Sequence, residues 1–174
     1  IMPSLVGSEM CIRDRIMDIK TIESGKILLV GYTANTKNGF AVISECMIRL
    51  QANKGKIANR SDRNCLIGLN DYKDFSGENG QPAFDFYAVA EVTDFFKIPD
   101  GMVTKELPAS KYVVFSFTGR PQDSLQPVAD YIYKEWFPQS TCQFNENAMY
   151  DFTKSDESVD KDGNGNIEYW VPIL

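Results

Sequence analysis

The sequence contains no histidine. This absence excludes Ser-His-Asp and Cys-His catalysis, and with them every zinc motif that needs a histidine ligand. The cysteines show no CxxC spacing; they are Cys11, Cys46, Cys65 and Cys142. We therefore expect idle reduced thiols, no metal site and no cofactor.

Long apolar runs and an excess of basic residues are also missing. No stretch approaches the roughly 18 apolar residues of a membrane span. Lys and Arg number 18 against 24 Asp and Glu, giving a net charge of −6. Nucleic-acid surfaces need clustered basic side chains, and no segment resembles a helix-turn-helix. We expect a soluble cytoplasmic protein that binds neither nucleic acid nor membrane directly.

The segment 110–138 is the clearest structural unit. Residues 111–118 alternate as a β-strand does, with one face formed by Val113, Phe115 and Phe117. Asp123 or Ser124 can cap a following helix, whose apolar stripe would comprise Leu125, Val128, Ile132 and Trp136. Pro127 suits the first helical turn, and Pro138 predicts the end of the helix.

An earlier segment follows the same design. Residues 26–33 predict a strand, and 40–52 predict a helix with the stripe Phe40, Ile43, Met47 and Leu50. Two more strands follow each helix, at 65–69 and 84–92 and at 149–155 and 166–173. The sequence therefore predicts an α+β fold. Two strand-helix-strand-strand repeats, about 17–94 and 97–174, would form a largely antiparallel sheet with helices on one side and a cleft between the repeats.

Residues 1–15 lack the periodicity of the rest of the chain. The peptide SLVGSEMCIRDR resembles translated sequencing-adapter DNA. We expect 1–16 to be a non-native or disordered extension and 17–174 to be the domain. A short native extension is the alternative.

The segment 160–167, DKDGNGNI, matches the start of an EF-hand calcium loop. The loop needs a bidentate carboxylate at its twelfth position, where this chain has Val171, and a helix on each side. Asp, Gly and Asn also suit a hairpin turn between strands. The favoured interpretation is a hairpin turn, with weak calcium binding as the alternative.

The last strand carries an acid beside an aromatic residue. Glu168 and Trp170 share one face, and Tyr169 lies on the other with its apolar neighbours. Such a pair can form the floor of a site for a flat cation. A solvated acid beside a locally packed Trp is the alternative. Glu91 is a weaker candidate of the same kind.

Five segments, in order, resemble the effector-binding domain of the GyrI-like family. They are FDFYAVAEV, IPDGMVTKELPASKYVVFSFTG, YIYKEWFP, YDFTKSDE and IEYWVPI. The family includes drug-sensing domains of bacterial transcription regulators, gyrase-inhibitory proteins and stand-alone members. The resemblance implies an aromatic-lined, acid-floored pocket for lipophilic and often cationic compounds.

The resemblance also implies site residues. The last-strand acid falls on Glu168 and its aromatic neighbour on Trp170. The family's other acid falls on Thr153, because this chain reads YDFT, and Asp151 on the same strand face could replace it. The other implied ligand-binding residues are Tyr112, Phe86 and Ala88.

Three functions remain open at this stage. The leading hypothesis is a stand-alone protein that sequesters or senses a lipophilic compound, where sensing would need a protein partner. The second is a hydrolase of cyclopropane-type toxins, with Glu168 as general acid or base and Tyr112 assisting. The third is a gyrase-type inhibitor that acts through protein–protein contacts. Binding is favoured over turnover.

Overall fold

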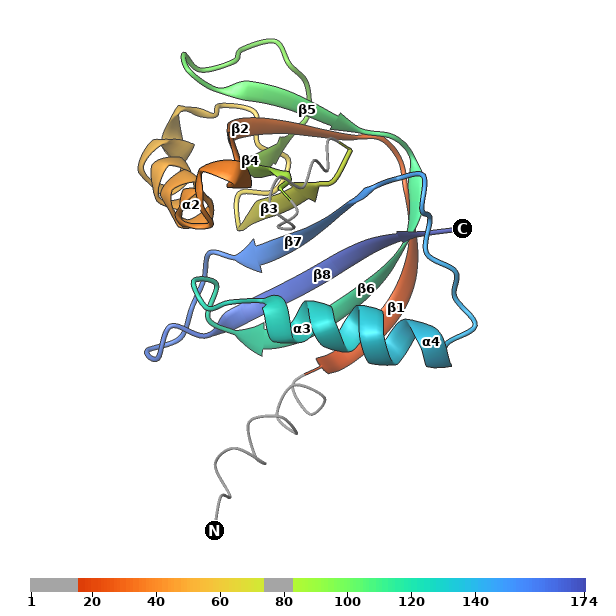
Figure 1. Cartoon of the computed structure of the whole chain (residues 1–174). Coiled ribbons are helices and arrows are strands. Elements are labelled where there is room, and N and C mark those ends of the chain that lie inside the picture. The colour runs from red at the N-terminus through yellow and green to blue at the C-terminus, as the bar shows by residue number, and fades with distance from the viewer. Residues whose placement is uncertain (1–15, 74–82) are drawn as a thin grey trace.

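The computed structural model describes residues 16–73 and 83–174, so the predictions for 1–15 lie outside the described residues. Eight strands form one antiparallel sheet in the order β1-β6-β8-β7-β3-β4-β2-β5 (Figure 1). The strands are β1 (Ile16–Ser24), β2 (Ile27–Asn35), β3 (Cys65–Asp71), β4 (Asp85–Val92), β5 (Val103–Leu107), β6 (Ser110–Gly119), β7 (Tyr150–Asp156) and β8 (Gly165–Ile173). The predicted α+β class is confirmed.

The two repeats exchange their first strands. β1 pairs with β6 of the second repeat, and β5 pairs with β2 of the first. Ser24 at the end of β1 lies opposite Ser110 of β6, and Ile27 at the start of β2 lies opposite Leu107 of β5. The chain therefore passes from β1 to β2 beside the place where it passes from β5 to β6. Each repeat therefore begins with one strand more than predicted. β1 also includes Ile16, which the sequence boundary had assigned to the extension.

The first helix packs on β2 and β4. It is α2 (Ala41–Asn53), flanked by the 3₁₀ turns η1 (Thr36–Asn38) and η2 (Lys54–Lys56). Leu50 is buried, while Ile43 and Met47 are partly buried in the same cluster. Phe40 is 61% exposed, so its place in the predicted stripe is wrong. The reason is that Phe40 precedes the first helical turn as the N-cap residue.

The second helix packs on β6 and β8. It consists of α3 (Gln126–Asp130), the π-helical turn η3 (Tyr131–Trp136) and α4 (Phe137–Gln139). Val128 and Ile132 are buried, as the stripe predicts. The helix nevertheless continues past Pro138, contrary to prediction. In the π turn the Phe137 N–H donates to the Ile132 carbonyl, five residues back. Because the regular hydrogen-bond pattern is already interrupted there, the helix accommodates Pro138, which has no N–H.

Both helices lie on one face of the sheet. In the first repeat Val30 and Ala88 face α2, and in the second Phe115 and Tyr169 face α3. The strand pairing shows that these side chains share one face. Gly68 of β3 lies opposite Ala88 of β4 and opposite Thr153 of β7, so the face continues from the first repeat into the second. We call this the helix face. The other, inner face holds a separate core cluster that includes Tyr112, Phe152 and Trp170.

The segment between β7 and β8 is a hairpin turn. The Asp160 carboxylate accepts hydrogen bonds of 2.9 Å from the backbone N–H groups of Asp162 and Asn164, and Gly163 has φ +83°. Such a φ favours glycine, and the side chain of Asp160 mimics a backbone turn. Within 16–73 and 83–174 no group of three or more His, Cys, Asp or Glu side chains is placed to hold a metal ion. The described helices include none long and apolar enough to cross a membrane.

Candidate small-molecule site

The residues that the resemblance implies as one pocket lie on both faces of the sheet. Those on the helix face are Phe86, Ala88, Asp151 and Thr153, and those on the inner face are Tyr112, Glu168 and Trp170. Successive residues of a strand point to opposite faces, so the pairing of Thr153 with Tyr169 separates Asp151 from Trp170. The seven residues are therefore divided between the two faces of the sheet, and their role in ligand binding stays a prediction.

On the inner face, Trp170 is already engaged by protein groups. Its Nε1 donates a 2.9 Å hydrogen bond to the Glu168 carboxylate. The ring stacks on Phe152 with centroids 5.3 Å apart, and Lys154 Nζ lies 4.6 Å from its centroid. Lys154 also binds Glu91 at 3.4 Å. The Glu168 carboxylate and the Trp170 ring, which a ligand would contact, are therefore already bound to other protein groups.

Four other implied residues are buried in the protein interior. Tyr112 is fully buried, and its hydroxyl lies 2.7 Å from that of Tyr150. Phe86 and Ala88 are buried in the cluster under α2. Thr153 is buried on the same face, and its hydroxyl and the Phe86 ring both pack at Gly68.

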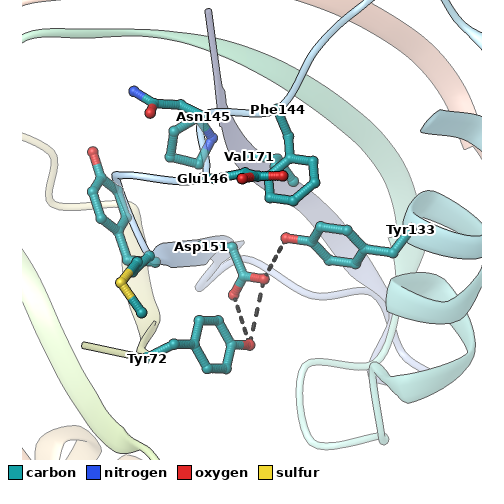
Figure 2. Close-up of a pocket in the computed structure, with 10 residues that line it drawn as sticks. Tyr72, Tyr133, Phe144, Asn145, Glu146, Asp151 and Val171 are labelled. Atoms are coloured by element: carbon teal, nitrogen blue, oxygen red, sulfur yellow. Dashed lines mark hydrogen bonds between the residues drawn. The ribbon is translucent and has the colours of Figure 1, made fainter. Parts of the chain in front are cut away.

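Asp151 differs from these residues because it is a buried acid with converging donors. Its exposed fraction is 1%. Asn70 Nδ2 donates to Oδ1 at 2.8 Å, and Tyr133 and Tyr169 donate to Oδ2 at 2.7 and 3.0 Å. The Tyr72 hydroxyl adds a longer contact of 3.4 Å to Oδ1 (Figure 2). Four donors from β3, the residue after β3, η3 and β8 therefore meet at one carboxylate.

Local structure explains this convergence. Asn70 lies directly opposite Asp151 in the β3–β7 ladder, and Tyr169 lies opposite Thr153 in the β7–β8 ladder. Tyr133 reaches the same carboxylate from the helix, where its ring stacks on Phe137 with centroids 5.9 Å apart. The donors are thus held by the sheet and the helix.

The electrostatics follow from burial. Burial raises the pKa of Asp151, and the hydrogen bonds from Tyr133, Asn70, Tyr169 and Tyr72 oppose this shift. Burial and the nearby carboxylate raise the pKa of Tyr72, Tyr133 and Tyr169, so these phenols stay protonated donors. In the described part of the chain no Lys or Arg forms an ion pair with Asp151. Its partners among these described residues are all neutral.

An open pocket of about 170 Å³ lies beside Asp151 (Figure 2). Its walls include Tyr72, Tyr133, Phe144 and Tyr150, and Met149, which has φ +54°, also lines it. Such a φ is unusual for a residue with a long side chain and stores backbone strain. The lining residues also include Glu146 and no Lys or Arg.

Sequence reasoning missed most of this site. It named Asp151 but not its donors Asn70, Tyr72, Tyr133 and Tyr169. The free thiols of Cys46, Cys65 and Cys142 lie outside the pocket, and burial raises the pKa of Cys65 to about 12. That thiol is a poor nucleophile at neutral pH.

Comparison with known proteins places the chain in a family. No curated protein matches it. Among solved structures, SAV2435 bound to tetraphenylphosphonium is 16% identical with a TM-score of 0.67, over 91% of this chain and 94% of that one. An integron cassette protein of Vibrio cholerae is 19% identical with a TM-score of 0.58, over 91% and 97%. A hydrolase of Listeria innocua is 8% identical with a TM-score of 0.51, over 97% of both chains. These likenesses show the fold. Residues 17–174 match the GyrI-like small molecule binding domain, and the chain belongs to this family.

Proposed function

We propose that this protein binds lipophilic cations in the pocket beside Asp151. The observation that carries the proposal is a carboxylate, 1% exposed, whose hydrogen-bond partners within 16–73 and 83–174 are all neutral. Removing a charge from water without a counter-ion is costly. A cationic ligand supplies the missing opposite charge in surroundings where screening is weak.

The pocket walls suit the apolar part of such a ligand. Its volume is about 170 Å³, and a cavity of about 150 Å³ is known to hold a benzene molecule. The pocket can therefore take one ring of a larger compound. Tyr133 and the 43%-exposed Phe144 offer ring faces and edges for stacking and for cation–π contact.

The comparisons support this chemistry. The domain family is one of small-molecule binders, and SAV2435 was solved with tetraphenylphosphonium, which is a lipophilic cation. Binding alone would serve to sequester a compound. A sensing role would require a protein partner.

Calorimetric titration with tetraphenylphosphonium tests the proposal. Asp151→Asn keeps the shape of the side chain and removes its charge. We expect its Kd to rise about tenfold or more, the range of a charge-assisted contact. Glu168→Gln is the matched control, because Glu168 lies on the opposite face and should leave Kd unchanged. Equal Kd values for the wild type and Asp151→Asn would refute the proposal. A loss confined to Glu168→Gln would move the site to the inner face.

A hydrolase that uses the same pocket is the second candidate. The raised pKa of Asp151 in a buried site favours it, because such a carboxyl can act as general acid. For this candidate we propose Asp151 rather than Glu168 as the general acid. Incubation with cyclopropane-containing toxins and chromatography of the products tests it. Product formation that is lost in Asp151→Asn would support catalysis, and no product would reject it.

A further inference from the structure

We infer that this pocket selects cations without N–H donors, such as quaternary ammonium and phosphonium ions, over primary ammonium ions of similar shape. The inference rests on the proposed function, since it concerns which cations bind beside Asp151. It depends on how the acceptor positions of that carboxylate are used.

A carboxylate has about four lone-pair positions for hydrogen bonds. Oδ1 of Asp151 accepts from Asn70 at 2.8 Å and from Tyr72 at 3.4 Å. Oδ2 accepts from Tyr133 at 2.7 Å and from Tyr169 at 3.0 Å. Three short hydrogen bonds and the Tyr72 hydroxyl, which lies 3.4 and 3.5 Å from the two oxygens, therefore surround the carboxylate, while these neutral donors leave its charge uncompensated.

The two types of cation differ in whether they need hydrogen-bond acceptors in the pocket. A primary ammonium carries three N–H donors and loses their bonds to water on entering the pocket. The acceptors left to it at the floor are phenol oxygens, and neutral acceptors give weaker bonds than a carboxylate. The Glu146 carboxylate also lines the pocket, but it is exposed to water, so its attraction is screened and acts on both kinds of cation. A quaternary cation has no donor to satisfy. It keeps the long-range attraction of the charge and the contact with the ring faces.

The geometry also limits direct access to the carboxylate. Figure 2 shows the hydroxyls of Tyr72 and Tyr133 converging on Asp151 from two sides. Both tyrosines line the pocket. Burial raises the pKa of both phenols, so they remain donors when a cation binds. A ligand N–H can reach an Asp151 oxygen only by displacing one of the protein's donors.

A matched pair of ligands tests the inference. They are (naphthalen-1-ylmethyl)trimethylammonium and naphthalen-1-ylmethylammonium, both monocations at neutral pH. The quantity measured by calorimetry is the selectivity ratio, defined as Kd of the primary ion divided by Kd of the quaternary ion. We expect a ratio of about ten or more in the wild type.

Two Tyr→Phe variants separate the proposed cause from general hydration. Tyr133→Phe frees one acceptor position on Oδ2, so the ratio should fall about threefold or more. Tyr87→Phe is the control, because Tyr87 is not among the residues that line the pocket and its hydroxyl forms no hydrogen bond with the described residues. Its ratio should stay within about twofold of the wild-type value. If Tyr133→Phe does not fold, Tyr169→Phe removes the other short hydrogen bond to Oδ2, of 3.0 Å, and has the same expected result.

The outcomes distinguish this inference from the proposed function. If both ions bind in an Asp151-dependent way but the ratio is near one, the donor selectivity is overturned and the proposed function stands. An unchanged ratio in both Tyr133→Phe and Tyr169→Phe also overturns the selectivity. If neither ion binds, or if Asp151→Asn binds both as the wild type does, both proposals fail.

Discussion

The hydroxyl of Tyr133 donates a 2.7 Å hydrogen bond to Oδ2 of Asp151, joining the π-helical turn η3 to strand β7. This contact fixes the second helix of the domain on the sheet at the position of the pocket. It also couples stability to the site, because the acceptor is a buried charge.

We expect Tyr133→Phe to lower the free energy of unfolding by about 1.5–3 kcal/mol, the usual contribution of a hydrogen bond to a charged group. Urea unfolding followed by circular dichroism measures this change. Tyr87→Phe is the control, because the Tyr87 hydroxyl forms no hydrogen bond with the described residues and its ring contact with Lys105 is kept. Equal stability of the two variants would mean that the Tyr133–Asp151 bond contributes nothing.

The stability of the wild type relative to Asp151→Asn should depend on pH. Burial raises the folded-state pKa of Asp151 above its ordinary value of 3.8. Between these two pKa values the folded state binds more protons than the unfolded state, so stability falls as the pH rises. Urea unfolding of both proteins at pH 7 and near pH 4 measures this dependence. The free energy of unfolding of the wild type, relative to that of the variant, should be larger at the lower pH. A gain at the higher pH would contradict the direction of the shift.

The fold was largely predictable because buried strands and helix stripes repeat at fixed periods. Val113, Phe115 and Phe117 alternate, and all three are buried on the helix face. β1 was missed because it is an edge strand. Lys20 and Glu23 are exposed on it, so its alternation is weak.

The site was only partly predictable from the sequence. The hairpin turn at 160–163 fixes the register that puts Tyr169 opposite Thr153, and hence on the face of Asp151. That signal was present in the sequence. Tyr72 and Tyr133 reach Asp151 from the end of β3 and from the second helix, and only the packing of distant segments brings them together. No local pattern encodes such a meeting.

Gly31 of β2 has no space for a larger side chain. A Cβ atom there would overlap the backbone carbonyl oxygen of Ala88 on the neighbouring strand β4. We expect Gly31→Ala to lower the free energy of unfolding by about 3 kcal/mol, the upper range for overpacking. Gly25→Ala, where no atom lies within 4 Å of the added Cβ, should cause no loss. Similar urea midpoints for the two variants would show that β2 can shift away from β4.

Glu157 connects the two repeats by an ion pair with two basic residues of the first repeat. Its carboxylate lies 2.6 Å from Lys54 Nζ and 2.8 Å from a guanidinium nitrogen of Arg60, whose side chain is 8% exposed. Glu157→Gln leaves that guanidinium buried without its counter-charge. We expect the free energy of unfolding to fall by about 2–3 kcal/mol, measured by urea unfolding at pH 7.

The exposed pair Lys26–Glu106 provides the matched control for this prediction. Its side chains are 59% and 49% exposed, so Glu106→Gln should change stability by less than about 1 kcal/mol. The effect of Glu157 should also depend on pH. Burial alone would raise the pKa of Glu157, but the hydrogen bonds from Lys54 and Arg60 lower it below 4.5. Its contribution is therefore present above pH 4.5 and lost as the pH falls through the lowered pKa. If Glu157→Gln costs no more than Glu106→Gln at pH 7, the repeats are held together by the sheet alone.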